Sequence, residues 1–224
     1  MNDSTAEFLF AQLPGQHARE EQLSALSAAI TGHRGEILGC RGAGQVELLE
    51  PGTPPAAVIV ARWSSRQDFD RAWDAAVSGP LDDLGGGRTD VLVLAMAGLP
   101  EEGLPDQLDV PTVASVPRTS LTTPPTYMTI QGSVTDQVRI AGYRDIILPM
   151  MKERGAFYIV FSISRGAMRV LRGAWSEEIF AISSWPTHEA AHDFWYSDRY
   201  QNVAYPIRRG IGTFHVHLLA GQAV

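Results

Sequence analysis

The amino-acid sequence predicts an α+β protein made of two similar units, one in each half of the chain. The first observation is a repeated pattern, in which an apolar strand ends in Trp and is followed by a polar cap and a helix with a second Trp. Trp63 and Trp73 are ten residues apart, and so are Trp185 and Trp195. The second observation is that the flanking segments also recur, at a separation of roughly 120 residues. The chain is therefore expected to contain two domains.

In the first half, runs of apolar and alternating residues predict strands at Glu7–Leu13, Glu36–Leu49, Ala57–Trp63 and Asp90–Ala97. Helices are predicted at Ala18–Gly32 and Arg66–Val77. The second helix begins after Ser65, and Asp68 stands three positions further on, which is typical of a capping pair.

In the second half, the same reasoning predicts strands at Thr126–Ser133, Ala156–Ser164 with an extension through Leu171, Ile179–Trp185 and Thr213–Leu219. Helices are predicted at Gln137–Glu153 and His188–Tyr196. Residues 99–125 are rich in Pro, Ser and Thr, so they are predicted to link a first unit at 1–98 to a second at 126–224.

The order of the predicted elements in each half is βαββαβ, which is the ferredoxin-like arrangement. This arrangement places both helices on one face of an antiparallel sheet and leaves the other face uncovered. Because an uncovered apolar face is unstable in water, the two units are expected to cover each other and form an intrachain pseudo-dimeric α/β barrel.

Composition and charge indicate which kinds of molecule the protein can bind. The formal net charge of −7 argues against nucleic acid, since phosphate binding needs a basic surface. No apolar run reaches the roughly 18 residues that a membrane span needs, and the first residues lack the pattern of a signal peptide. The single cysteine, Cys40, excludes an internal disulfide. A cytoplasmic location without membrane or nucleic-acid partners is therefore expected.

Strand alternation divides the side chains between the helices and a predicted cavity between the sheets. In the last strand, Phe214, Val216 and Leu218 share one face, so His215 and His217 are expected to face the cavity. The same reasoning gives the second half a polar cavity wall, made of Tyr127, Thr129, Gln131, Tyr158, Ser162, Ser183 and Trp185.

The first half is expected to supply a mostly apolar wall, with Glu36 near its rim. Its substrate-binding candidates are Phe10, Leu38, Trp63, Leu92 and Leu94. A polar wall facing an apolar one is typical of a pocket for an amphipathic small molecule. The alternative is a closed interface in which the hydroxyl groups bond to one another or to trapped water.

The candidate catalytic residues are those that can move a proton or stabilise negative charge. His215 and His217 are predicted to act as base and acid, because an imidazole can do either near neutral pH. Tyr158 and Tyr127 could stabilise an oxyanion, Ser183 could orient the substrate, and Glu36 could serve as a carboxylate base.

Two further patterns are interpreted as structural. His188 to His192 match the His-Glu-x-x-His pattern of zinc enzymes, but no third ligand follows, and this helix should turn Ala191, Phe194 and Trp195 inward. No metal is therefore predicted there. Arg208 and Arg209 are expected to lie on a solvated surface.

The second half also resembles a known family. The similar segments are Arg154–Gly155, Arg169–Gly173, Trp185–Thr187, Glu189–Ala191, Phe194–Gln201 and Pro206–Arg209. They resemble domain-of-unknown-function family thirteen-thirty, in the dimeric α/β-barrel superfamily. This resemblance implies the fold. It leaves the reaction open, since the superfamily includes cofactor-free monooxygenases, polyketide cyclases, small lyases and isomerases, haem enzymes and proteins without a known reaction.

The leading hypothesis is a cofactor-independent cyclase, isomerase or lyase that acts by proton transfer on a polyketide-like or aromatic biosynthetic intermediate. One alternative is a cofactor-free monooxygenase of the same barrel type, and another is a non-catalytic binding or carrier protein. The expected partner is a small-molecule substrate, and the chain is expected to be a monomeric pseudo-dimer or a homodimer.

Overall fold

The computed structural model describes residues 5–13, 19–86, 90–101, 103, 109–117 and 124–222. These residues form a mixed α+β structure with two antiparallel sheets, each of five strands. The contacts divide the chain into two compact units. The first contains Met1–Glu47, Thr53–Gly98 and Gly166–Ser176, and the second contains Leu48–Gly52, Leu99–Arg165 and Glu177–Val224.

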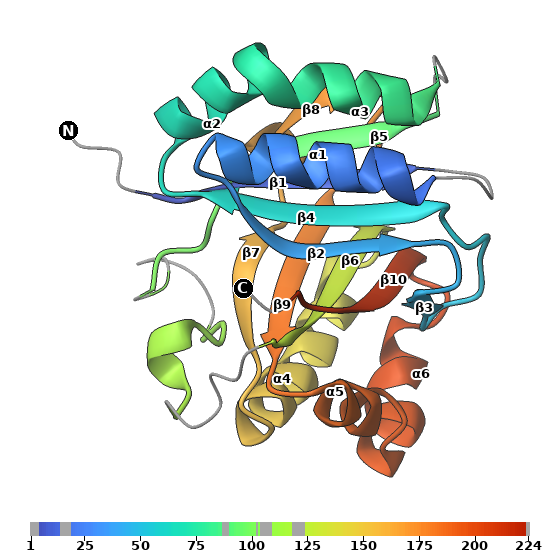
Figure 1. The fold of residues 1–224 in the computed structure, drawn as a ribbon. Helices are drawn as coiled ribbons and strands as arrows, with labels where there is room; N and C mark the ends of the chain where they lie inside the picture. The colour runs from blue at the N-terminus through green and yellow to red at the C-terminus, as the bar shows by residue number, and fades with distance from the viewer. Residues whose placement is uncertain are drawn as a thin grey trace. The chain divides into compact units, whose positions relative to one another are not determined.

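The sheet of the first unit has the strand order β2-β4-β1-β5-β8 (Figure 1). Its strands are β1 (Glu7–Leu13), β2 (Glu36–Gly42), β4 (Ala57–Trp63), β5 (Leu92–Ala97) and β8 (Met168–Arg172). Helices α1 (Glu20–Gly32), α2 (Arg66–Ala72) and α3 (Ser78–Gly85) cover one face of this sheet. Alternate strand residues such as Leu9 and Ala11 pack against them in the core of the unit.

The second helical region of the first unit is longer than predicted. The capping prediction is confirmed, because Ser65 Oγ accepts a hydrogen bond from the Asp68 amide at 3.2 Å. A π-helical turn at Trp73–Val77 then joins α2 to α3. The helix ends where Gly86 adopts a φ of +57°, a left-handed conformation that favours glycine.

The sheet of the second unit has the strand order β3-β10-β6-β9-β7. Its strands are β3 (Val46–Leu48), β6 (Thr126–Val134), β7 (Phe157–Ser162), β9 (Ile179–Trp185) and β10 (Gly212–Ala220). Helices α4 (Gln137–Glu153), α5 (His188–Trp195) and α6 (Tyr205–Arg208) lie over one face, and a π-helical turn at Tyr200–Ala204 leads into α6. This π turn and α6 were not predicted.

Each unit includes a short segment from the other half of the chain, Gly166–Ser176 in the first unit and Leu48–Gly52 in the second, which the contiguous ranges 1–98 and 126–224 do not describe. The predicted long strand Glu36–Leu49 is broken by a turn at Gly44, whose φ is +78°. After this turn the chain joins the second sheet, and the Leu49 amide donates to the Val216 carbonyl at 3.0 Å. In the same way, β8 pairs with β5 in the first sheet.

Part of the predicted linker belongs to the second unit. The Leu99 amide donates to the Ile159 carbonyl at 2.8 Å, and the Tyr158 amide donates to the Pro111 carbonyl at the same distance. Both hydrogen bonds hold this region against β7, so the described part of the linker is bonded to the sheet edge.

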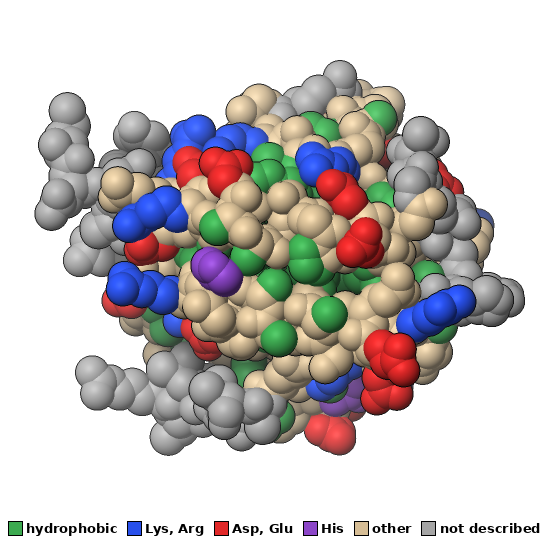
Figure 2. Space-filling view, turned by 45° about the horizontal axis from the view of Figure 1, so that its top comes forward, with side chains coloured by type: hydrophobic (Ala, Val, Ile, Leu, Met, Phe, Trp, Pro, Cys, Tyr) green, Lys and Arg blue, Asp and Glu red, His purple; other side chains and the backbone are tan. Residues whose placement is uncertain are grey.

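Two surface properties bear on partners. On the face shown in Figure 2, acidic and basic side chains are interspersed among small apolar patches. Among the described residues, no helix has both the length and the apolar character needed to cross a bilayer.

Candidate functional site

A cavity of about 110 Å³ lies within the second unit, between the sheet and the helices that cover it. Apolar and aromatic side chains dominate its lining, and a few polar groups interrupt them. The lining residues are Met128, Ile130, Gln137, Ile140, Tyr143, Arg144, Ile147, Met151, Tyr158, Phe161, Ile163, Glu178, Ile179, Ala181, Ser183, Trp185, Phe194, Trp195, Arg208, Phe214 and Val216.

Local sequence patterns explain why these side chains converge. On β6 and β10, Met128, Ile130 and Val216 reach the same side because strand residues two apart share a face. On α4, Ile140, Ile147 and Met151 are spaced by whole numbers of turns and therefore face the sheet. The start of α4 is secured by Asp136, whose carboxylate accepts from two backbone amides at 3.0 and 3.1 Å.

Arg208 provides a buried positive charge at the cavity, with only 3% of its surface exposed. Its guanidinium pairs with Glu50 and donates to the Tyr200 hydroxyl at 3.3 Å. Burial acts to lower the pKa of Arg208, but Tyr143, Tyr200 and Glu50 outweigh this effect and raise it, so the group stays charged. The prediction of a solvated surface role for Arg208 is therefore wrong, whereas Arg209 is exposed.

Aromatic rings complete the surroundings of Arg208. Its guanidinium carbon lies 4.5 Å from the centroid of Phe214 and between 5.2 and 5.7 Å from three further rings, those of Tyr143, Trp195 and Tyr205. Such cation–π contacts stabilise a desolvated cation. The sequence offered one signal of this arrangement, namely aromatic residues at short intervals before Arg208.

Arg144 and Glu178 are half-buried charged residues that also line the cavity. The Nε atom of Arg144 is buried, and it has no hydrogen-bond partner among the described residues. An unpaired buried donor costs about 1–3 kcal/mol, so this guanidinium retains the capacity to bind an acceptor. Neither residue was among the predicted site residues.

Tyr158 and Ser183 add neutral polar groups to the cavity wall. Burial raises the pKa of Tyr158 well above its ordinary value, so the hydroxyl remains protonated and can donate a hydrogen bond. Ser183 Oγ accepts from the indole N–H of Trp185 at 2.9 Å. These three residues face the helices, and the expectation that they face away from them is wrong.

The predicted orientation fails at the strand ends because the tryptophans pack against the helices. The ring centroids of Trp185 and Phe194 are 4.9 Å apart, and those of Trp63 and Phe69 are 5.1 Å apart. A register shift between Tyr158 and Val160 also changes the alternation along β7. Trp63 therefore belongs to the helix-side core of the first unit.

The predicted histidines lie on the opposite face of the same sheet from this cavity. Along β10 they alternate with Val216, a lining residue, and His217 pairs with Thr129 across the strands. His215 is exposed, whereas His217 is buried. The Nδ1 atom of His217 and the Oγ1 atom of Thr129 have no partner among the described residues. Tyr127, Gln131 and Ser162 share this face.

Burial, and to a smaller extent the nearby His215, lower the pKa of His217 from 6.5 to about 4. His217 is therefore neutral at physiological pH. Its predicted catalytic role stays a prediction, and this role does not involve the cavity beneath the helices.

The candidates from the first half lie in the first unit. Phe10 and Leu94 are cross-strand neighbours on the face away from the helices, and Leu92 follows in the same alternation. Leu38 is buried beside a register shift in β2. Glu36 is ion-paired with Arg62 at 2.5 Å, and 38% of its side chain is exposed. These positions do not bring Glu36 into the second-unit cavity.

The His-Glu-x-x-His segment lies on the outer side of α5. Ala191, Phe194 and Trp195 are buried as predicted, and His188 and His192 are exposed with ring centroids 6.0 Å apart. Within the described ranges, no group of three or more His, Cys, Asp or Glu side chains is arranged to hold a metal ion.

Solved structures share the fold at low sequence identity. A protein of Fusobacterium nucleatum subsp. nucleatum, provisionally described as a monooxygenase, is 9% identical with a TM-score of 0.52, over 99% of this chain and 94% of that one. A mutant chlorite dismutase from Candidatus Nitrospira defluvii is 11% identical with a TM-score of 0.51, over 99% and 92%. An anthrone oxidase-like protein is 12% identical over 99% and 92%, with a TM-score of 0.44.

At these identities, the first two similarities show the fold alone, and the TM-score of the third is too low for an argument. No curated protein matches the sequence. Residues 125–222 match the family model described as "Domain of unknown function (DUF1330)", in agreement with the predicted resemblance. The similarity to the DUF1330 family therefore covers residues 125–222, in the second half of the chain.

Proposed function

We propose that the protein is an enzyme that acts by proton transfer on a small amphipathic acid, bound in the helix-side cavity of the second unit. The observation that carries this proposal is the half-buried Arg144, which lines a mostly apolar cavity and whose buried Nε has no partner among the described residues. An apolar cavity binds the body of a ligand, and a guanidinium binds a carboxylate with good geometry. A ligand with an apolar body and a carboxylate would therefore match both the apolar lining and Arg144.

The size of the cavity limits the ligand. A dry engineered cavity of about 150 Å³ binds benzene. The cavity of about 110 Å³ in the second unit is smaller than this, so it limits the ligand to about one ring, unless the side chains of the mouth move apart.

The polar lining residues support a reaction that starts by removing a proton next to a carbonyl group. Glu178 would take the proton as a carboxylate base, and the neutral Tyr158 hydroxyl would donate a hydrogen bond to the developing enolate oxygen. Returning the proton to another carbon atom would complete an isomerisation. Cyclisation and elimination can begin from the same enolate.

The test uses benzoate as an acidic ring compound and benzamide as its neutral counterpart. Isothermal titration should detect benzoate binding to the wild type, and Arg144→Gln should weaken it by about tenfold, the loss of one charge-assisted contact. Lys152→Gln removes the same charge from α4 at a residue outside the lining and should change benzoate affinity little. Equal benzoate affinity in the wild type and Arg144→Gln would refute the anchoring role.

Proton transfer is tested with phenylpyruvate, an aromatic acid with an exchangeable carbon-bound proton next to its carbonyl. Proton NMR in D₂O should show exchange above the buffer rate, and Tyr158→Phe should slow it by about ten- to a hundredfold. Tyr196→Phe, at an exposed position, is the matched control. Exchange that is no faster than in buffer would refute the proton-transfer step for this substrate class.

Two other functions use the same fold. A cofactor-free monooxygenase is favoured by the name of one fold relative, and substrate turnover without oxygen would exclude it. A carrier would bind benzoate without catalysing exchange. The pairing of the two units in one pseudo-dimeric barrel, and acid–base catalysis by His215 and His217, stay predictions from the sequence.

A further inference from the structure

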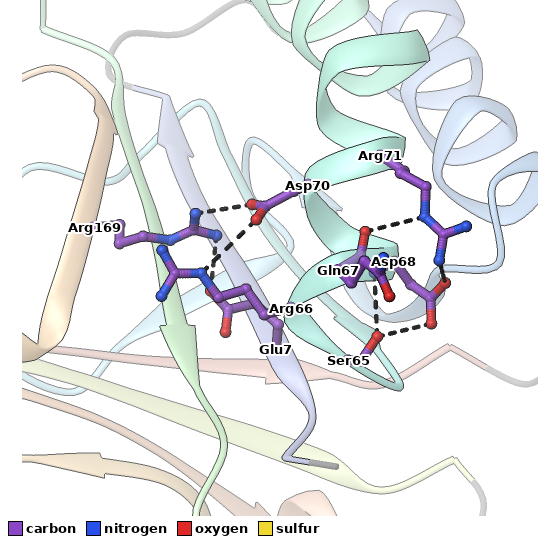
Figure 3. A network of polar contacts seen from close by, with 8 residues as sticks. All are labelled: Glu7, Ser65, Arg66, Gln67, Asp68, Asp70, Arg71 and Arg169. Carbon is purple, nitrogen blue, oxygen red and sulfur yellow. Dashed lines mark hydrogen bonds and ion pairs between the residues drawn. The ribbon is translucent and has the colours of Figure 1, made fainter. Parts of the chain in front are cut away.

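A second, polar cavity of about 120 Å³ lies within the first unit. Charged residues occupy one part of its lining, and small side chains from β5 and the segment before β8 leave space beside them. The lining residues are Thr5, Glu7, Arg66, Ala95, Met96, Ala97, Ala167 and Arg169. Figure 3 shows the charged residues together with their neighbours on α2.

The lining of this cavity carries a net positive charge. Arg66 and Arg169 contribute two guanidinium groups, and Glu7 contributes one carboxylate. Asp70 does not line the cavity, but it pairs with both arginines, at 3.8 Å from Arg66 and 2.8 Å from Arg169 (Figure 3). Glu7 and Asp70 together balance the two guanidinium groups, so an anionic ligand would compete with these carboxylates for the guanidinium N–H groups.

The two arginines differ in how firmly they are held. Arg169 is fixed by Asp70 and by Glu7, whose carboxylate accepts from its Nη2 at 2.9 Å, and its guanidinium lies 5.2 Å from the Phe69 ring. Its buried Nε still has no acceptor among the described residues. Arg66 has 57% of its side chain exposed, and its ion pair with Asp70 is long, at 3.8 Å. One arginine is thus preorganised, and the other can move onto a ligand.

We propose that this cavity binds the oxyanion group of a small ligand, a carboxylate or a phosphate, between the guanidinium groups of Arg66 and Arg169. Planar guanidinium groups donate paired hydrogen bonds to such oxygens. Ala95, Ala97 and Ala167 leave the space that the oxygens need. The proposal concerns the first unit and is independent of the function proposed for the second.

Glu7 makes this binding depend on pH. Its carboxylate is buried, with 4% of its surface exposed. Burial raises the pKa of Glu7. Arg169 and Arg66 act in the opposite direction, and Asp70 adds to the rise. Protonation of Glu7 removes the negative charge that competes with the ligand, so the affinity for an oxyanion should rise as the pH falls.

The experiment titrates the full chain with sulfate, inorganic phosphate and acetate, at constant ionic strength, by isothermal titration calorimetry. One saturable site is expected, and Arg66→Gln should weaken sulfate binding by about tenfold. Glu7→Gln should act in the opposite direction, raising sulfate affinity and removing its dependence on pH. Sulfate serves for the pH series because its charge is constant from about pH 8 to about pH 5.

Arg172→Gln is the control for a general loss of positive charge, because Arg172 lies on β8 like Arg169 but pairs with Asp82 outside the cavity. Wild-type sulfate affinity in Arg66→Gln, or an equal loss in Arg172→Gln, would overturn the proposal. Binding of acetate but not of phosphate and sulfate assigns a carboxylate ligand, and the reverse assigns a phosphate. No saturable binding of any of the three would also overturn it.

Discussion

At the scale of single residues, burial decides which polar groups can do chemistry. Arg208 is buried, yet it remains charged because Glu50 and four aromatic rings surround it. Arg144 lines the same cavity with its Nε unpaired among the described residues. Both arginines carry the same charge. They differ in their partners, because Arg208 is paired with Glu50 whereas Arg144 retains a donor for a ligand.

His217 provides a prediction about stability and pH. The pKa of His217 is about 4 in the folded protein, below its ordinary value of 6.5. The unfolded chain therefore binds the proton more readily than the folded protein does. The stability that the lowered pKa of His217 contributes is present above about pH 6.5 and is lost as the pH falls towards 4. The loss is expected to be about 3 kcal/mol of unfolding free energy.

Urea unfolding of the wild type and of His217→Leu at several pH values measures this effect. The variant should lose stability less steeply between these pH values than the wild type. His215→Leu, at the exposed neighbouring position, should keep most of the wild-type slope, because burial is the larger cause of the lowered His217 pKa and His215 is the smaller one. Equal slopes in the wild type and His217→Leu would show that the imidazole is not the group responsible.

At the scale of elements, the ion pair of Arg208 and Glu50 joins α6 to the segment Leu48–Gly52, which the first half of the chain contributes to the second unit. Glu50→Ala should lower the unfolding free energy by about 3 kcal/mol, because it leaves a buried guanidinium without its carboxylate. Urea unfolding gives the value. Adding Arg208→Met should recover most of the loss, since no buried charge then remains unpaired. A loss below about 1 kcal/mol for Glu50→Ala would contradict this account.

The same scale explains which elements could be predicted. Strands such as Ala57–Trp63 and helices such as Gln137–Glu153 were predicted with the observed bounds, because their apolar patterns and caps are local. The π turn at Tyr200–Ala204 and α6 were missed. They are short, and Pro206 interrupts the helical pattern, so contacts with α4 and α5 rather than local propensity stabilise them.

At the scale of the whole molecule, the exchanged strands make each half depend on the other. A fragment of residues 1–98 lacks β8, including the partner that Arg169 provides for Glu7. This fragment is expected not to fold cooperatively by itself, whereas mixing it with a fragment of residues 99–224 should restore a stable complex. Circular dichroism and analytical ultracentrifugation measure both properties. Cooperative unfolding of the isolated 1–98 fragment would contradict the prediction.

The sequence by itself determined the duplicated element order, the strand and helix bounds of most elements and the DUF1330 resemblance, because these follow from patterns within short segments. Only the tertiary structure decided the partners of β3 and β8, the helix-side position of Tyr158 and the burial of Arg208. Alternation placed His215 and His217 on the face away from the helices, as the structure has them, but it placed Trp63 and Trp185 on the wrong face, because both faces of their strands are rich in apolar residues. Strand exchange and charge burial depend on residues far apart in the sequence, which a local pattern does not bring together.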